Sequence, residues 1–203
     1  AILGSNDFVV LPERGLGEYG KVDFVIVKPL HKKKILDFFG LEIVSIDTTS
    51  TRHLNDAVDD LLSGRLQEKY AFGLNFAHTL KLMITQVILK GSVMEHWNKR
   101  YVWVVQDVLF NRLQEWTGLS VSDDLDQNLL VFLLIKMKYD DENNLFTLSN
   151  LGFKSSSVKD FRSKITVKET KIPKFDGFVK KLEKDVEEIY WQNRQPKISN
   201  FRK

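Results

Sequence analysis

The sequence predicts an α/β domain, and two observations support this fold class. Short runs rich in Val, Ile and Phe alternate along the chain with segments whose apolar residues recur at helical spacing. Hydrophobic residues make up 43% of the 203 positions and include 14 Phe and 4 Trp, which is enough apolar material for a packed core. No internal repeat interrupts the pattern, so one domain of ordinary size accounts for most of the chain.

The first two predicted strands are separated by a connector. Residues 21–28 (KVDFVIVK) are rich in Val, Ile and Phe and are predicted to form a strand. Residues 29–40 are predicted as a connector that opens at Pro29 and closes at Gly40. Residues 41–48 (LEIVSIDT) are predicted as the next strand, which leads into a hydroxyl-rich turn.

Two helices are predicted after the second strand. In residues 54–66 the apolar side chains recur at helical spacing, and Gly64 ends or interrupts this helix. Residues 75–91 form the second predicted helix, with Asn75 as its N-cap and Gly91 as its C-terminal stop. The apolar stripe of the second helix is expected to belong to the core.

The rest of the chain continues the alternation. Residues 101–107 (YVWVVQD) are almost continuously apolar, which is typical of a central strand. The remaining predicted elements are a short helix at 108–118 that stops at Gly118, a strand at 129–140, a strand at 164–170 and a charged helix at 175–192.

The charge is distributed unevenly. Residues 154–203 contain 14 Lys and Arg against 7 Asp and Glu, whereas the whole chain has a net charge of only +3. We therefore predict an α/β core at 1–153 and a basic extension at 154–203 packed on the same domain. The extension is suited to a polyanion, although a solvated lysine-rich surface explains its charge equally well. The candidate DNA contacts are Lys154, Lys159, Arg162 and Lys164.

Composition also excludes several kinds of site. The chain has no Cys, which excludes disulfides and Cys-based metal sites. The four His show no paired metal spacing, and no phosphate-binding loop or nucleophile elbow is present. No apolar run approaches the roughly 20 residues that span a bilayer, and the first residues lack the features of a signal peptide. A soluble, cytoplasmic protein without membrane contact is expected.

Two carboxylates on the first two predicted strands form the candidate catalytic site. Asp23 lies within the first strand, and Glu42 lies near the start of the second. If the strands pair, both carboxylates reach one point at the sheet edge, where a divalent cation relieves their repulsion; oxygen ligands favour Mg²⁺. Because side chains alternate along a strand, Ile43 points away from Glu42 and can offer its main-chain carbonyl to the metal. Two strand-edge carboxylates facing water are the alternative.

A family resemblance rests on four segments: GEYGKVDFVIV, GLEIVSIDTTST, GLNFAHTLKLMITQVILKG and RYVWVVQDVLF. In this order they resemble the PD-(D/E)xK nuclease core, and more specifically the NotI-like type II restriction endonucleases, across residues 15–110. The resemblance implies a restriction-endonuclease-like core with a central mixed β-sheet flanked by helices. It also implies Mg²⁺-dependent cleavage of double-stranded DNA by a homodimer, with Asp23 and Glu42 as the motif acids and Glu18 as an extra carboxylate near the metal.

The third motif position departs from the family. Lys or Gln is expected there, but this chain has Val44, which can neither position a water nor stabilise the charge of the leaving phosphate. Lys81 and Gln86 on the second predicted helix are candidates to replace it. Alternatively the metal acts alone, or the site is inactive and the protein serves as a DNA-binding or protein-interaction module. Asp47, which strand parity turns away from Glu42, is expected to orient the turn.

Overall fold

The fold is known from a computed structural model, which divides the chain into two compact units, Ala1–Ile165 and Thr166–Lys203. The residues that the structure describes are 7–30, 34–143, 145–165 and 174–194.

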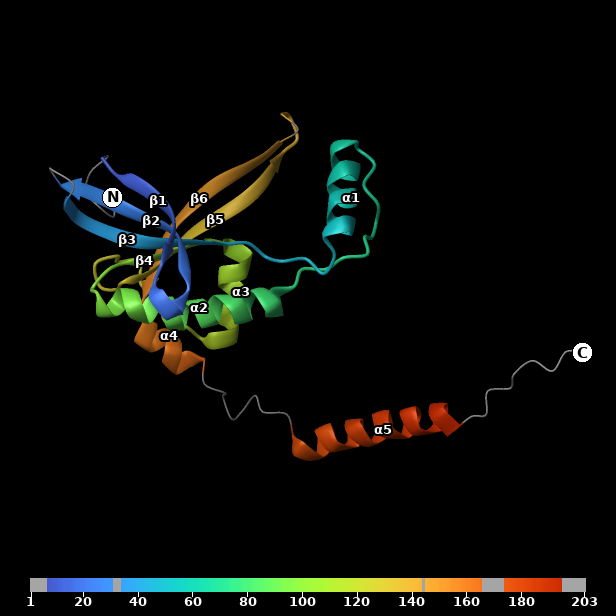
Figure 1. The fold of residues 1–203 in the computed structure, drawn as a ribbon. Helices are drawn as coiled ribbons and strands as arrows, with labels where there is room; N and C mark the ends of the chain where they lie inside the picture. Colours follow the sequence, from blue (N-terminus) through green and yellow to red (C-terminus); the bar gives the residue numbers. More distant parts are fainter. Residues whose placement is uncertain (1–6, 31–33, 144, 166–173, 195–203) are drawn as a thin grey trace, which may run out of the picture. The chain divides into compact units, whose positions relative to one another are not determined.

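The first unit is built on one six-stranded sheet, in which the strands lie in the order in which they occur along the chain (Figure 1). The strands are β1 (Val9–Gly15), β2 (Lys21–Leu30), β3 (Lys34–Val44), β4 (Tyr101–Gln106), β5 (Leu130–Asp140) and β6 (Leu145–Ser156). β1, β2 and β3 pair antiparallel, β4 lies parallel to both β3 and β5, and β6 pairs antiparallel with β5. The prediction of an α/β fold with a mixed sheet flanked by helices is confirmed.

Helices make the crossovers between the parallel strands. The helical elements of the first unit are η1 (Gly17–Tyr19, a 3₁₀ turn), α1 (Thr51–Leu62), α2 (Phe76–His96), α3 (Asp107–Thr117) and α4 (Val158–Lys164). The start of α2 is as predicted, because the Asn75 side chain accepts a hydrogen bond from the His78 N–H at 3.3 Å. The end of α3 is also as predicted, because Gly118 follows it with a left-handed φ of 68°.

The main core lies between the sheet and three helices. α2, α3 and α4 contribute to one cluster of buried side chains together with Tyr101 and Trp103 of β4. Val102, which points to the other face of β4, belongs to a second, smaller cluster. β4 is therefore buried on both faces, which confirms that its continuous apolar run marks a central strand.

The connector predicted at 29–40 is wrong, because β3 begins at Lys34 and forms a hairpin with β2. The pairing shifts register between Lys28 and Pro29, and such an irregularity accommodates a residue that cannot donate to the ladder. The predicted second strand also ends early, at Val44.

Two glycines were predicted to end elements, but both lie inside elements at points of close packing. A Cβ on Gly40 would lie 2.8 Å from Met94 Cε, so a side chain at this position of β3 would displace the end of the Met94 side chain of α2. A Cβ on Gly91 would lie 3.1 Å from Val158 Cγ2, and α2 continues past Gly91 to His96. In both cases the missing side chain admits a neighbouring element.

Replacing Gly40 with alanine is expected to lower the free energy of unfolding by about 1–3 kcal/mol, the usual cost of overpacking a core. The new methyl would meet Met94 at 2.8 Å and the Tyr101 ring at 3.1 Å. Urea unfolding measures the effect. Gly15→Ala is the matched control, since Gly15 is also in a strand and a Cβ there would have no neighbour within 4 Å. Equal stability of the two variants would contradict the close packing of β3 against α2.

The first unit extends further than the predicted core. The predicted boundary after residue 153 falls within β6, and α4 follows before the unit ends at Ile165. Neither the N-terminal strand β1 nor α4 was predicted. Of the strand predicted at 164–170, Lys164 is the last residue of α4, and 166–170 lie outside the described residues.

The second unit contains the helix α5 (Phe175–Arg194), which confirms the helix predicted at 175–192. Phe178, Leu182 and Val186 are exposed apolar side chains on this helix. Across the described parts of both units, none of the helices combines the length and the hydropathy needed to cross a bilayer.

Candidate active site

The two predicted metal ligands lie where β2 and β3 separate. The pairing of the two strands ends with Phe24 opposite Leu41, so Asp23 and Glu42 are each the next residue beyond the last pair. At this point the main-chain N–H of Ile43 donates to Asp23 Oδ2 at 3.0 Å. The Asp23 carboxylate therefore takes the place of a strand partner for β3, which satisfies a main-chain donor and fixes the carboxylate against β3.

Glu42 is held inside the protein by two donors. It lies opposite Trp103 in the pairing of β3 with β4, and only 3% of its surface is exposed. Its Oε1 accepts hydrogen bonds from Lys90 Nζ and from the Tyr101 hydroxyl, each at 2.8 Å. Lys90 comes from α2 and is also buried. A buried carboxylate needs a partner of opposite charge and further hydrogen bonds, and Glu42 has both.

The environment of Glu42 alters its ionisation. Burial raises the pKa of the Glu42 carboxyl above its ordinary value, and the charge of Asp23 acts in the same direction, while Lys90 and Tyr101 oppose both effects. Burial and the Glu42 charge also raise the pKa of Tyr101, so its hydroxyl stays protonated and remains a donor. The repulsion between Asp23 and Glu42 is the kind of strain that a bound cation relieves.

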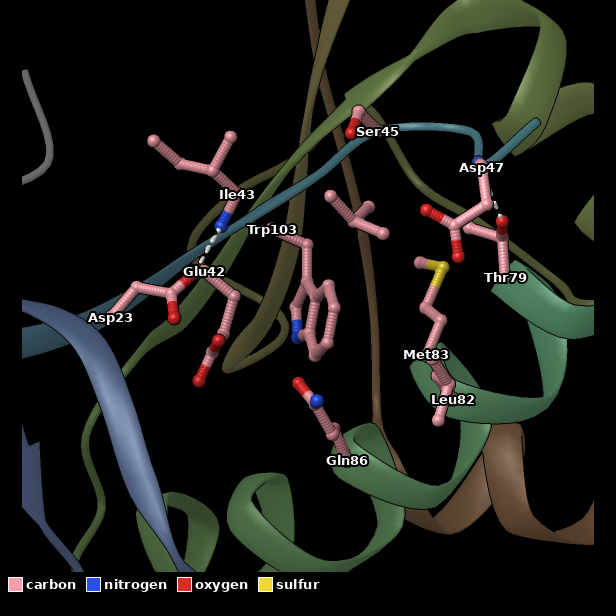
Figure 2. A pocket seen from close by; sticks show the side chains of 11 residues that line it. Asp23, Glu42, Ile43, Ser45, Asp47, Thr79, Leu82, Met83, Gln86 and Trp103 are labelled. Carbon is pink, nitrogen blue, oxygen red and sulfur yellow. Dashed lines mark hydrogen bonds between the residues drawn. The ribbon is translucent and has the colours of Figure 1, made fainter. Parts of the chain in front are cut away.

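Asp23 and Glu42 open into one pocket of about 240 Å³ (Figure 2). The pocket lies between the ends of β2 and β3, the segment that follows β3 and the first half of α2. Its other lining residues are Ile43, Val44, Ser45, Asp47, Thr79, Leu82, Met83, Gln86 and Trp103. The side chain of Ile43 is 56% exposed whereas Glu42 is buried, which confirms that neighbouring residues of β3 face opposite sides.

The structure brings one of the two predicted replacements for Val44 to the site. Gln86 lines the pocket, whereas Lys81 is exposed and is not among the lining residues. A basic group, Lys90, contacts the site without lining the pocket. It donates to two of the lining residues, to Gln86 Oε1 at 3.4 Å and to Glu42.

Sequence reasoning missed Lys90. Its helical position supplied a signal, because it continues the apolar stripe of α2 after Met83 and Val87 and before Met94, all of which are buried. A lysine at a core position of a helix is rarely buried without a charged partner. A lysine within this apolar stripe therefore predicts an acidic partner for Lys90 in the core, and in the structure that partner is Glu42.

Asp47 also lines the pocket, contrary to the parity prediction. The alternation of side chains stops because β3 ends at Val44. The Asp47 N–H donates to Thr79 Oγ1 at 3.1 Å, and its carbonyl accepts from the Asn75 N–H at 2.7 Å. These main-chain bonds hold the segment after β3 against the start of α2, but they do not involve the Asp47 carboxylate, whose expected role in orienting this turn stays a prediction.

Trp103 forms a buried wall of the pocket with an unused donor. Its side chain is 1% exposed, and its indole N–H has no acceptor among the residues that the structure describes. Gln86 lines the same pocket, but its carboxamide makes no hydrogen bond with the indole. Because a buried donor without an acceptor is unfavourable, this N–H is available to an oxygen atom that enters the site.

The carboxylate oxygens of Asp23 and Glu42 fit a hard divalent cation whose remaining coordination positions are filled by water or substrate. Asp23 Oδ1 and Glu42 Oε2 receive no hydrogen bond from any described residue. No three His, Cys, Asp or Glu side chains in the described ranges are grouped closely enough to hold one ion. Mg²⁺ commonly takes one or two carboxylates and completes its shell with water and substrate oxygens, so the pair is sufficient. Glu18 is exposed in η1 and does not line the pocket.

The four basic residues predicted to contact DNA all belong to the first unit. Lys154 lies on β6 and pairs with Asp123 Oδ1 at 2.6 Å. The other three are on α4, where Arg162 donates to Ser92 Oγ at 2.8 Å and Lys159 is exposed. Protein contacts therefore engage Lys154 and Arg162.

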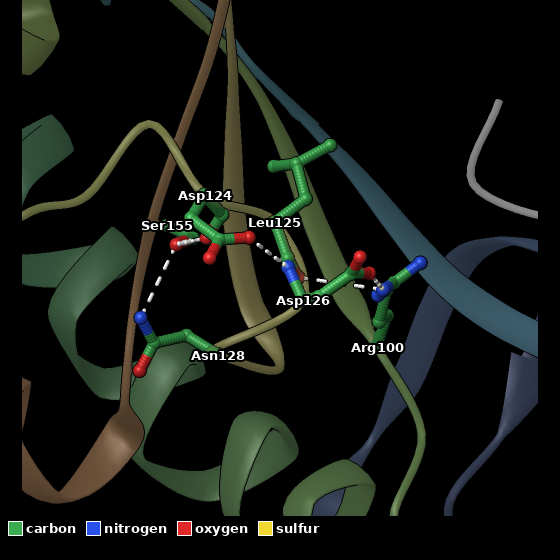
Figure 3. Close-up of polar contacts among 6 residues, drawn as sticks. All are labelled: Arg100, Asp124, Leu125, Asp126, Asn128 and Ser155. Carbon is green, nitrogen blue, oxygen red and sulfur yellow. Dashed lines mark hydrogen bonds and ion pairs between the residues drawn. The ribbon is translucent and has the colours of Figure 1, made fainter.

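The loop that precedes β5 forms an ion pair with Arg100 (Figure 3). Asp126 Oδ1 accepts from Arg100 Nη2 at 2.7 Å, and the Asp126 N–H donates to Asp124 Oδ1 at 2.9 Å. The Ser155 hydroxyl donates to the Asp124 carbonyl at 2.6 Å and accepts from Asn128 Nδ2 at 3.2 Å. These bonds tie the loop to the start of β4 and the end of β6, and the loop offsets the charge of Arg100 as Asp123 offsets that of Lys154.

Comparison of the chain with protein-family models and with curated proteins finds no match in either. The functional interpretation therefore depends on the carboxylate pair and the groups that surround it.

Proposed function

We propose that the protein is a Mg²⁺-dependent endonuclease of the type II restriction or a related defence class, with a restriction-endonuclease-like core. Its substrate is duplex DNA, in which it hydrolyses phosphodiester bonds. One observation carries the proposal: Asp23, Glu42 and Gln86 line one pocket, and the Lys90 ammonium contacts both Glu42 and Gln86. Two acids with a Lys or Gln are the side chains that the PD-(D/E)xK resemblance implies. Here α2 supplies the group that Val44 cannot supply.

The carboxylates would hold the metal. Asp23 and Glu42 are the ligands, with the main-chain carbonyl of Ile43 as the predicted third. Mg²⁺ held by these groups would supply the polarisation of the phosphodiester and would lower the pKa of a bound water. The remaining work falls to the protein's own groups, which must keep Glu42 ionised and orient the water.

The groups behind the carboxylates do this work. The Lys90 ammonium stabilises the charged form of Glu42 in a buried environment. The carboxamide of Gln86 is placed in the pocket to orient the attacking water, since it can both donate and accept. The indole N–H of Trp103 can donate to a second oxygen of water or substrate.

Cutting both strands of a duplex requires two such sites, and we therefore propose a homodimer. Lys159, which is exposed, and Lys164 both lie on α4 and are suited to sequence-independent, salt-sensitive contacts with DNA phosphates. The second candidate function is a catalytically inactive module that binds DNA or protein through the same fold. Val44 favours this alternative, and the presence of Gln86 and Lys90 at the site favours the enzyme.

Incubation with supercoiled plasmid tests the proposal. The wild-type protein is expected to nick or linearise the plasmid with Mg²⁺ and not with EDTA. Asp23→Asn removes one metal-binding charge and is expected to lower the cleavage rate about 100-fold or more. Glu18→Gln is the matched control, because Glu18 is an exposed acid just before the same strand and outside the pocket. It is expected to cleave at the wild-type rate.

The same assay separates the two candidate functions. Absence of any metal-dependent cleavage would reject the enzyme. Salt-sensitive retention of DNA in a binding assay would then identify the binding module.

A further inference from the structure

Tyr101 of β4 contacts the candidate catalytic acid without lining the pocket. Its side chain is 1% exposed, and its hydroxyl donates to Glu42 Oε1 at 2.8 Å. Lys90 Nζ donates to the same oxygen at the same distance. Both donors therefore act on one oxygen of the carboxylate, and Oε2 accepts nothing from the part of the chain that the structure describes.

The ring of Tyr101 is fixed by its surroundings. A Cβ on Gly40 would lie 3.1 Å from the ring, and a Cβ on Gly91 would lie 3.4 Å from it, so β3 and α2 approach its two sides closely. The ring also meets Trp103 edge to face, with centroids 5.6 Å apart. A hydroxyl on a ring held this way is presented to Glu42 in one geometry.

We infer that Tyr101 is a positioning residue, which holds Glu42 Oε1 so that Oε2 would be available to a divalent cation bound in the pocket. The inference rests on the proposed function and adds to it a residue that touches neither metal nor DNA. A hydrogen-bond donor behind a ligating carboxylate fixes its orientation, and the loss of such partners reduces metal affinity or activity. Lys90 stabilises the negative charge of Glu42, and Tyr101 fixes the orientation of its carboxylate.

Tyr101→Phe removes the hydroxyl and keeps the ring in place. We expect the Mg²⁺ concentration for half-maximal cleavage to rise about 10-fold, the lower end of the effect of losing such a partner. The Michaelis constant for DNA is expected to stay at the wild-type value. Calorimetric titration with Mg²⁺ in the absence of DNA should show the same loss of affinity, which a merely structural role would not produce in a variant that melts at the wild-type temperature.

Tyr70→Phe is the matched control. The Tyr70 hydroxyl also donates to a carboxylate, Asp60 Oδ2 at 3.1 Å, but neither residue lines the pocket. Its Mg²⁺ titrations are expected to match those of the wild type. If Tyr101→Phe does not fold, Gly40→Ala provides a second variant, because its methyl would lie only 3.1 Å from Tyr101 Cδ2 and so displace the ring while the hydroxyl is kept. It is expected to weaken Mg²⁺ binding as well, and an unchanged affinity would overturn the inference.

The outcomes separate the inference from the function on which it rests. Wild-type Mg²⁺ affinity in folded Tyr101→Phe would overturn the positioning role, whether or not the wild type cuts DNA. A wild type that binds Mg²⁺ without cutting, together with a weakened Tyr101→Phe, would reject the nuclease and keep the positioning role. A wild type that binds no Mg²⁺ would reject both.

Discussion

Replacing Lys90 with methionine is expected to reduce Mg²⁺-dependent DNA cleavage about 100- to 1,000-fold, the usual cost of losing one preorganised electrostatic group. Methionine keeps most of the stem of Lys90 in the core. Without the ammonium, Glu42 Oε1 keeps only the Tyr101 hydroxyl as a donor. The pKa of the buried Glu42 carboxyl, which lies next to Asp23, then rises further, and a carboxyl that holds its proton more tightly is a weaker metal ligand. Plasmid cleavage at saturating DNA measures the effect.

The same substitution is expected to destabilise the folded protein by about 3–5 kcal/mol at neutral pH, since it removes one partner of a buried ion pair. The loss depends on pH. Without Lys90 the pKa of Glu42 in the folded protein rises further, so the folded protein keeps a proton that the unfolded chain has released. This loss of unfolding free energy is small below the ordinary pKa of a glutamate. It grows as the pH rises towards the pKa of Glu42 in the folded variant, and it is complete above that pKa. Urea unfolding over a series of pH values measures this dependence.

Lys81→Met is the control for both measurements. Lys81 lies on the same helix but is exposed and outside the pocket. A surface substitution of this kind changes stability by less than about 0.5 kcal/mol, and cleavage is expected to be unchanged. Wild-type cleavage by Lys90→Met would show that the ammonium behind Glu42 has no part in the reaction.

Local sequence signals predicted most of the first unit. They failed where the role of a residue depends on packing against residues that are distant in the sequence. The runs of Val, Ile and Phe located β2 and β4, and Asn75 and Gly118 marked helix ends, because each acts within its own segment. Gly40 and Gly91 look the same in sequence as Gly118. Their role is to admit side chains that lie far along the chain, so only the packed structure distinguishes them from caps.

In the candidate site, too, the sequence predicted the residues on consecutive strands but not the partner that comes from a distant helix. The order of the strands was enough to place Asp23 and Glu42 in one pocket, because consecutive strands often pair. The basic partner of Glu42 lies 48 positions away on α2. Which turn of that helix meets β3 depends on how Met83, Val87 and Met94 pack against the sheet, so Lys81 and Lys90 could not be distinguished by distance from the motif alone.

Replacing Glu42 with glutamine is expected to abolish Mg²⁺ binding and to lower cleavage about 1,000-fold or more, because a metal ligand and its charge are lost together. Glutamine has nearly the same shape and still accepts hydrogen bonds from Lys90 and Tyr101. The loss is therefore expected without a change of fold. Calorimetric titration with Mg²⁺ and the plasmid assay measure it, and retained Mg²⁺ affinity would show that the cation binds elsewhere.

The Glu42→Gln variant also reports on how Glu42 ionises. Burial raises the pKa of Glu42 in the folded wild type, so folding takes up a proton in the range just above the ordinary pKa of a glutamate. The free energy of unfolding of the wild type is therefore lowered as the pH rises through this range, and the full cost is present above the folded pKa. Glutamine does not titrate. The stability of the variant minus that of the wild type is thus expected to increase with pH and then level off, and a decrease would contradict the raised pKa.

Combining Glu42→Gln with Lys90→Met shows whether the two residues act as a pair. Each single variant leaves one buried charge without its partner, whereas the double variant leaves neither. At neutral pH the double variant is expected to be more stable than the sum of the two single effects predicts, by about 1–3 kcal/mol, as found for residues in direct contact. Strict additivity would mean that the ammonium does not stabilise the Glu42 carboxylate. The loss of cleavage in Lys90→Met would then need another cause, because the charge of the metal ligand would not depend on α2.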